Sequence, residues 1–312
     1  RHRRRKPKAL LLDFNMNSMA VDDDFAATYV LGPNLGGDER SVPHASFDFP
    51  GFGRTVDIYL PNAVFWSHLT QTIVLVSLFG IVLSGVVRSC VVKRRGSALS
   101  YLVGIAVICA NVFFPYAIIH VLGVQNLVTK FSLCAFTTLY LFRTSEAIFG
   151  FSPAGVEDSP KSYLWYYAFP VELELDRKTA KPVEATKYEV AENALMLLKA
   201  FLQLCIMFSL FAPHSFEPFD GRPAPGSSLL SYFNLGHLGN CFMAAYMFQL
   251  GLAFYGHAMT AVVNLSAGLK TIVPMNNPLL EATSPSDFWG RRWNVLVHGV
   301  LKRGVYKPVR KY

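Results

Sequence analysis

The segment formed by residues 277–310, NPLLEATSPSDFWGRRWNVLVHGVLKRGVYKPVR, contains the residue types best suited to chemistry in this chain. Arg291 and Arg292 lie among aromatic residues, and an arginine guanidinium can hold a phosphate through two parallel hydrogen bonds. Asn294 and His298 follow, and their side chains could contact a polar head group. An asparagine can also stabilise charge that develops at a reacting centre. The segment therefore predicts a site for a phosphate or another polar head group.

The same segment carries the signals of a helix start. Ser284 is a favoured N-cap residue, Pro285 suits the first helical position, and Asp287 places a negative charge at the positive end of the helix dipole. These signals predict one helix over residues 285–301. At about 100° per residue, one polar stripe of this helix would contain Asp287, Arg291, Asn294, His298 and Lys302. Most of the other side would be apolar: Phe288, Trp289, Trp293, Leu296, Val297 and Val300.

Two interpretations of this amphipathic helix remain open from the residue types alone. The helix could lie in the membrane interface, with tryptophan rings at headgroup level and cations facing acidic lipid. It could instead line a cavity inside a membrane protein, where arginine binds phosphate. In either case the long stem of Arg292, which falls among apolar neighbours, could reach headgroups or a phosphate.

Composition identifies the chain as an integral membrane protein. Of its 312 residues, 52% are hydrophobic and 16% are charged, whereas soluble domains are nearer a quarter charged. The net charge of +8 reflects cations in loops beside apolar segments, which is typical of a membrane protein and argues against nucleic acid as a partner. The five cysteines are scattered, so neither a disulfide framework nor a metal site is predicted.

Hydropathy divides the chain into three regions. Residues 1–61 are predicted to form an N-terminal arm outside the membrane, residues 62–270 a transmembrane helical region with a large loop at 151–190, and residues 271–312 the region of the amphipathic helix. Five apolar segments are long enough to cross the bilayer: 63–87, 99–122, 127–149, 194–212 and 238–269. The predicted fold is all-α, a polytopic bundle of about five transmembrane helices plus a C-terminal amphipathic helix.

Loop charges predict the sidedness of these spans. Cations are concentrated after the first, third and fifth apolar segments, whereas the opposite side carries Lys130 and Arg222. By the positive-inside rule, the cation-rich side faces the cytosol, or the stroma or matrix of an organelle.

Polar residues inside the apolar segments are further candidates for function. Arg143 and Glu146 are three residues apart and are predicted to pair as neighbours on one helix face. His257 and Asn264 share a face of the last apolar segment. They are expected either to form hydrogen bonds between helices or to line a tunnel for an acyl chain or an alcohol behind Asn294.

The run of NPLL, a Thr/Ser stretch, DFWGRRWN and VY-x-PVR resembles the signature of plant-type wax synthases. These are long-chain-alcohol O-fatty-acyltransferases of the membrane-bound O-acyltransferase superfamily. The resemblance implies transfer of a fatty acyl group from acyl-CoA, a substrate rather than a cofactor, to a long-chain alcohol or another lipid hydroxyl. It implies a catalytic role for Asn294. The substrate-binding residues would be Trp289, Arg291, Arg292, Trp293 and His298.

One family feature has no counterpart in this sequence. The catalytic histidine of wax synthases lies in a stretch resembling S-G-x-x-H-E, beyond the PVR tail, and no such stretch occurs here. The sequence is therefore expected to be part of a longer enzyme, and whether this chain catalyses acyl transfer stays open. The alternative is a non-catalytic, wax-synthase-derived membrane subunit with protein partners in a larger complex. Either protein would reside in the endoplasmic reticulum or an organelle membrane.

Overall fold

The computed structural model of the protein is mainly helical and describes residues 45–48, 55–58, 63–124, 127–176, 178–211, 214, 217–221, 223 and 226–311. The long helices are α2 (Ala63–Val86), α3 (Ala98–Val121), α4 (Leu127–Phe149), α6 (Lys187–Phe211) and α7 (Leu235–Ala267). Shorter helices are η3 (Val87–Val92), α5 (Pro160–Ala168), η5 (Leu229–Phe233), α8 (Pro278–Glu281), α9 (Pro285–Asp287), η6 (Phe288–Arg292), α10 (Val295–Leu301), η7 (Lys302–Tyr306) and α11 (Lys307–Lys311). The strands are β1 (Ala45–Asp48), β2 (Thr55–Ile58), β3 (Glu172–Leu173) and β4 (Thr271–Ile272).

Apolar helices of membrane-spanning length confirm the predicted membrane character. Within the described ranges, Leu69–Val92, Ala98–Val121 and Lys187–Phe211 are long and apolar enough to cross a bilayer. The predicted number of five spans is not confirmed. The long helix α4 carries three charged residues, Lys130, Arg143 and Glu146. The predicted N-terminal arm, residues 1–61, lies outside the described residues except for β1 and β2, which form an antiparallel pair.

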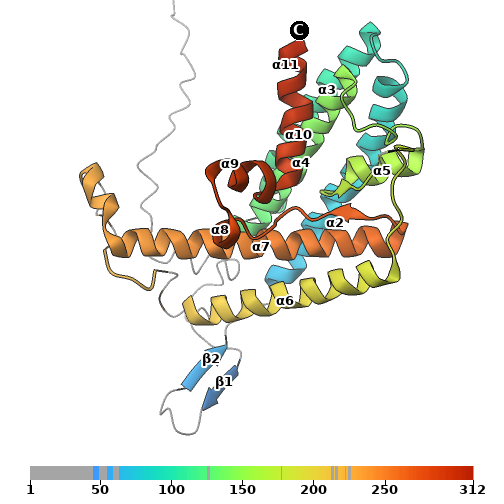
Figure 1. Ribbon diagram of the computed structural model, residues 1–312. Coiled ribbons are helices and arrows are strands. Elements are labelled where there is room, and N and C mark those ends of the chain that lie inside the picture. The colour runs from blue at the N-terminus through green and yellow to red at the C-terminus, as the bar shows by residue number, and fades with distance from the viewer. Residues whose placement is uncertain are drawn as a thin grey trace, which may run out of the picture.

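The long helices run in two directions (Figure 1). α3, α4 and the C-terminal helices α10 and α11 run alongside one another, whereas α6 and α7 pack along each other and cross the direction of α4. Aromatic contacts mark the crossing of α7 with α4. Phe131 meets Phe248 with ring centroids 5.5 Å apart, and Phe136 meets Tyr255 at 5.8 Å. The C-terminal segment therefore lies on α4, beside the point where α7 crosses it.

The core is formed mainly by α2, α4, α5 and the C-terminal half of α7. Tyr140 of α4 is fully buried, and a buried tyrosine hydroxyl needs a partner. Its hydroxyl lies 2.7 Å from the carbonyl oxygen of Ala168 and 3.2 Å from that of Val76, so one side chain joins α4 to α5 and α2. Its ring also stacks on Tyr167, with centroids 5.6 Å apart.

A two-stranded sheet links the loop at 151–190 to the C-terminal region. β3 pairs antiparallel with β4, with Glu172 opposite Ile272 and Leu173 opposite Thr271. α7 is capped at its C-terminal end by Gly268, whose φ of 68° is a left-handed conformation that glycine adopts without strain. The chain thus turns from α7 directly into β4, which places Glu172 beside the segment that carries the predicted site.

Candidate functional site

The predicted helix over residues 285–301 is broken in the structure. Ser284 caps the helix start as predicted, since its hydroxyl accepts from the amide of Asp287 at 3.1 Å. The helix ends after η6 because Trp293 is extended and Asn294 has a left-handed backbone with φ 41°. Backbone hydrogen bonds to residues 274–276 stabilise this break in the helix. The amide of Val295 donates to Pro274 O at 2.9 Å, and the amide of Asn276 donates to Arg292 O at 3.0 Å.

The break redistributes the predicted polar stripe. Asn294 becomes the N-cap of a second helix, α10, where its Oδ1 accepts from the amide of Val297 at 3.2 Å. Arg291 and His298 are exposed and belong to separate helices, η6 and α10. The prediction of one continuous amphipathic helix is therefore wrong. Asn294 lies at the junction of two short helices and is half-buried against the segment 274–276.

Aromatic rings gather on one side of this junction. Phe288 and Trp293 stack with centroids 5.3 Å apart, and Trp293 reaches Phe248 of α7 at 6.3 Å. Trp289 meets Trp293 edge-on at 5.9 Å and is 63% exposed. This cluster of Phe248, Phe288, Trp289 and Trp293 offers an apolar surface next to Asn294, so the structure brings together three of the predicted site residues, Trp289, Trp293 and Asn294.

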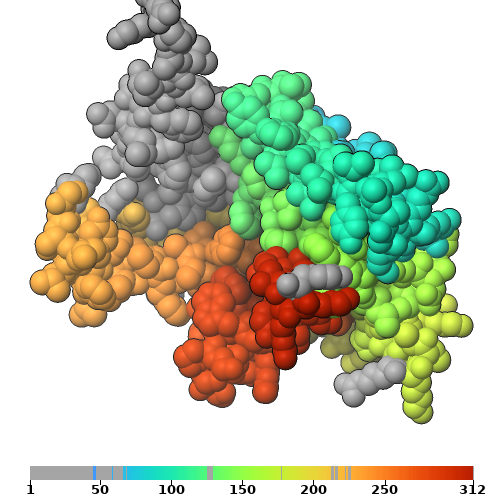
Figure 2. Space-filling model, turned by 90° about the horizontal axis from the view of Figure 1, so that it is seen from above, coloured from blue at the N-terminus to red at the C-terminus, as the bar shows by residue number. Residues whose placement is uncertain are grey.

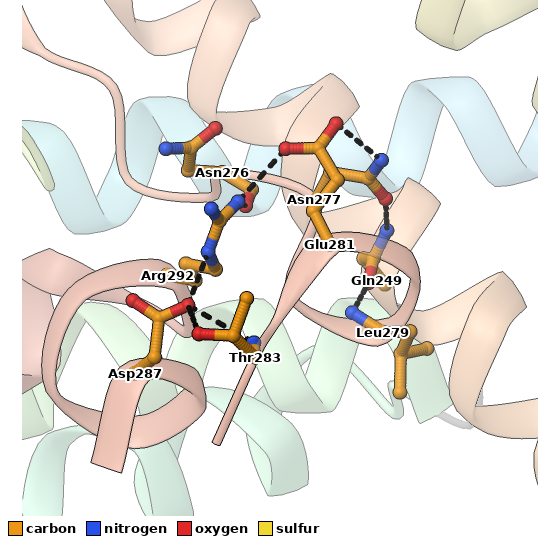
Figure 3. Close-up of polar contacts among 8 residues, drawn as sticks. All are labelled: Gln249, Asn276, Asn277, Leu279, Glu281, Thr283, Asp287 and Arg292. Atoms are coloured by element: carbon orange, nitrogen blue, oxygen red, sulfur yellow. Dashed lines mark hydrogen bonds and ion pairs between the residues drawn. The ribbon is translucent and has the colours of Figure 1, made fainter. Parts of the chain in front are cut away.

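A chain of polar contacts runs from α7 into the segment that precedes Asn294, residues 276–292 (Figure 3). Gln249 is buried, accepts from the amide of Leu279 at 3.1 Å and donates to the side-chain oxygen of Asn277 at 3.3 Å. The side chain of Asn277 in turn donates to Glu281 at 2.9 Å. Asn277 has a left-handed backbone with φ 40°, like Asn294. The loop is thereby tied to a fixed point on α7.

Arg292 closes this polar chain with two carboxylates. Its Nε donates to Asp287 Oδ2 at 2.8 Å and its Nη1 donates to Glu281 Oε2 at 2.8 Å (Figure 3). The hydrogen bond from Arg292, followed by that from the amide of Thr283, holds the pKa of Asp287 below its usual range. The pKa of Glu281 is lowered first by Asn277 and then by Arg292. These contacts tie Arg292 into the loop, and its predicted contact with a substrate phosphate stays a prediction.

Replacing Arg292 with glutamine is expected to loosen this loop, because Asp287 and Glu281 lose their shared cation. Amide hydrogen exchange of residues 276–294 should be faster in the variant than in the parent at neutral pH. Both carboxyls have lowered pKa values when folded. Their stabilising contribution is therefore present at neutral pH and is lost as the pH falls through those values. On acidification, the parent's exchange, corrected for its intrinsic pH dependence, should approach that of the variant.

Arg291→Gln is the matched control for this experiment, because it removes the neighbouring exposed charge and leaves the ion pairs of Arg292 in place. Equal protection in Arg292→Gln and the parent at neutral pH would show that the ion pairs do not hold the loop.

A second polar cluster attaches the C-terminal helices to α4. The guanidinium of Arg303 forms a two-pronged contact with Glu172 of β3, both N···O distances being 2.9 Å. Its Nε donates to Glu146 of α4 at 3.1 Å. The hydroxyl of Tyr166 of α5 donates to the other oxygen of Glu146, whose side chain is fully buried. One arginine therefore joins α4, α5, β3 and η7.

The predicted pairing of Arg143 with Glu146 is corrected by these contacts. Arg143 instead donates to the carbonyl oxygens of Phe169 and Val171, each at 2.6 Å, and lies over the ring of Tyr166 at 4.3 Å. These carbonyls follow the end of α5 and need donors. Two residues three apart on a helix can pair, but here Arg143 bonds to the carbonyls after α5 and Glu146 pairs with Arg303.

Close backbone packing accompanies the Arg303 cluster. A Cβ atom on Gly304 would lie 2.7 Å from the carbonyl oxygen of Phe142, so a glycine is required where η7 approaches α4. The hydroxyl of Ser145 donates to the carbonyl oxygen of Gly304. The contacts at Gly304 and Arg303 fix the end of α10, while the cap of Asn294 fixes its start.

His257 and Asn264 take part in packing between elements. The Nδ1 of His257 lies 2.8 Å from the side-chain oxygen of Asn193 on α6, and Asn193 donates back to the His257 carbonyl oxygen at 3.1 Å. The amide of Asn264, oriented so that its nitrogen and oxygen both find partners, donates to the carbonyl oxygen of Leu269 at 2.7 Å. These contacts favour the interpretation of hydrogen bonding over that of a tunnel.

Comparison with curated proteins finds plant enzymes that transfer acyl groups to oxygen. The chain is 35% identical over 89 residues to the probable long-chain-alcohol O-fatty-acyltransferase 9 of Arabidopsis thaliana, covering 26% of this chain and 25% of that protein. It is 36% identical over 78 residues to the long-chain-alcohol O-fatty-acyltransferase of Simmondsia chinensis, covering 25% and 22%. It is 47% identical over 51 residues to the acyl-CoA–sterol O-acyltransferase 1 of Arabidopsis thaliana, covering 16% and 14%.

These alignments span a quarter or less of the length of the relatives. No family model matches the chain, and no solved structure gives a significant match. The resemblance to plant long-chain-alcohol O-fatty-acyltransferases, the wax synthases, is confirmed by the curated relatives.

Proposed function

We propose that this chain forms part of a membrane O-acyltransferase, which moves a fatty acyl group from acyl-CoA to a long-chain alcohol or another lipid hydroxyl. The observation that carries the proposal is the similarity to three enzymes named for acyl transfer to an alcohol or sterol oxygen. The apolar helices support it, because both the acyl chain and the acceptor are membrane-soluble.

In the proposed reaction, the lipid hydroxyl attacks the thioester carbonyl of acyl-CoA. The new ester C–O bond forms, the C–S bond breaks, and the hydroxyl proton leaves with the coenzyme A thiol. The family resemblance assigns proton removal to a histidine in an S-G-x-x-H-E-like stretch, and we assign that step to no residue of this chain. Asn294 would position the substrate or donate to the oxyanion that develops at the carbonyl.

The remaining predicted site residues would bind substrate around Asn294. Trp289 and Trp293 belong to an aromatic cluster that would contact the apolar chain of a substrate. Arg291 and His298 are exposed on either side of the junction and would meet the polar part of acyl-CoA. The side-chain oxygen of Asn294 caps α10. We propose that its amide nitrogen is the group offered to the substrate.

The membrane placement is also part of the proposal. Five spans would require α4 and α7 to cross the bilayer in addition to the three apolar candidates, with α6 and α7 strongly tilted relative to α4, whose direction they cross. α4 has 23 residues and α7 has 33, and crossing about 30 Å of hydrocarbon takes about 20 helical residues. We place the protein in the endoplasmic reticulum or an organelle membrane, where acyl-CoA and lipid alcohols meet.

The test is ester synthesis by the full-length protein in microsomes from a host without this activity. Labelled acyl-CoA would be offered with a long-chain alcohol, a sterol or a diacylglycerol, and the lipid products separated by thin-layer chromatography. We expect a labelled wax ester above the empty-vector background. Membranes that contain the folded protein and form no ester with any of these acceptors would overturn the proposal.

A further inference from the structure

Six exposed cations gather at one end of the helical bundle, and the proposed reaction uses none of them. We name this set the basic end surface: Lys93, Arg94 and Arg95 of the α2–α3 connection, with Lys307, Arg310 and Lys311 of α11. One of the six, Arg95, pairs with a carboxylate, that of Glu157, at 2.6 Å.

The α2–α3 connection fixes the depth of this surface in a membrane. The apolar segments Leu69–Val92 and Ala98–Val121 are separated by only residues 93–97. When both segments span the bilayer, a five-residue connection cannot extend far into solvent. Lys93, Arg94 and Arg95 must then lie at headgroup level.

Contacts through the end of α4 bring α11 to the same level. Arg95 donates to the carbonyl oxygen of Ala147 at 2.8 Å and lies against Gly150. The next residue, Phe151, has Lys307 and Lys311 over its ring, with their Nζ atoms 5.7 and 5.6 Å from its centroid. Figure 2 looks onto this end and shows α11 on the same face as the connection between α2 and α3.

We propose that the basic end surface binds the anionic headgroups of phospholipids in the leaflet that it faces. Cations on two segments far apart in the sequence meet at headgroup level, where a negative surface potential attracts lysine and arginine. Binding there would anchor α11, and through Gly304 and Arg303 the helix α10 that begins at Asn294. The inference does not depend on acyl transfer.

The test measures lipid selectivity of the full-length protein in phosphatidylcholine vesicles. Spin-labelled phosphatidylserine or phosphatidylcholine is added in trace amounts, and the protein-bound fraction of each is read from the spectrum. We expect severalfold selectivity for phosphatidylserine at low salt and less at high salt, because exposed charges are screened. Equal binding of the two lipids at low salt would overturn the proposal.

Three double variants locate the effect. Lys307→Gln/Lys311→Gln should lose most of the selectivity, and Lys130→Gln/Lys199→Gln, which removes two cations elsewhere, should retain it. Lys307→Arg/Lys311→Arg should restore it and show that charge is responsible. Unchanged selectivity in the glutamine pair of α11 would overturn the assignment to this surface. Displacement of the bound lipid by free coenzyme A would instead identify a site for soluble phosphates and also overturn it.

Discussion

Replacement of Arg303 with alanine is expected to lower the free energy of unfolding of the detergent-solubilised protein by about 3–5 kcal/mol, the usual effect of removing one partner from a buried ion pair. Glu146 is fully buried and would keep the hydroxyl of Tyr166 as a hydrogen-bond donor and the more distant charge of Arg143, but would lose its ion-pair partner. Glu172 would lose a two-pronged partner. The loss is large because a buried carboxylate that loses its ion-pair partner cannot regain water in the interior.

The measurement is reversible unfolding in mixed micelles, followed by circular dichroism. Lys302→Ala is the matched control, since this neighbouring cation is exposed and should have little effect. Replacing all three charged residues, with Arg303→Met, Glu146→Leu and Glu172→Leu, should recover part of the loss because no charge is then left unpaired. An Arg303→Ala protein as stable as the Lys302→Ala protein would show that the cluster contributes little.

Replacement of Asn294 with aspartate is expected to reduce ester formation by about tenfold or more while the fold is kept, as loss of an oxyanion donor does in other enzymes. Aspartate retains the oxygen that caps α10 and is an equally favoured N-cap. It also tolerates the left-handed backbone found at this position. What it lacks is the amide N–H donor.

Two further variants separate the donor from the scaffold. Asn294→Gly keeps the backbone conformation and loses both the cap and the donor, so its activity should be as low as that of the aspartate variant, and its stability slightly lower. Asn294→Ala adds backbone strain and should be the least stable of the three. Wild-type kcat in Asn294→Asp would remove the amide from the reaction and leave Asn294 a structural cap.

Local signals predicted the parts of this region that depend on neighbours in sequence. Ser284 caps its helix because an N-cap needs only the amide three residues on. The break at Asn294 depends on Pro274, twenty residues earlier, whose carbonyl oxygen accepts from Val295. No helical periodicity reveals such a contact. Asn294 could be chosen as a site candidate from its residue type and its aromatic and arginine neighbours. Its role as the N-cap of α10 could not be predicted, because the break that creates α10 was not predicted.

The difference between local and long-range contacts also explains why the charged residues inside the bundle were recognised but their partners were not. Arg143 and Glu146 were recognisable as charges in an apolar helix, yet their partners lie beyond the helix, on the chain after α5 and on η7. The interhelical role of His257 followed from its chemistry, since a polar side chain in an apolar helix must find a partner. Glu172 and Arg303 gave no local signal, because they are 131 residues apart and acquire their role only when β3 pairs with β4.

The polar chain of Figure 3 has a consequence for protein engineering. Asn277, Glu281, Asp287 and Arg292 bond to one another within sixteen residues, and the side chain of Gln249 links them to α7. A segment whose polar side chains bond mainly to one another can be exchanged as a unit. We expect chimaeras that receive residues 276–294 from a plant relative to fold when the recipient keeps a glutamine at the place of Gln249. Acceptor preference could then be transplanted by a single exchange of nineteen residues.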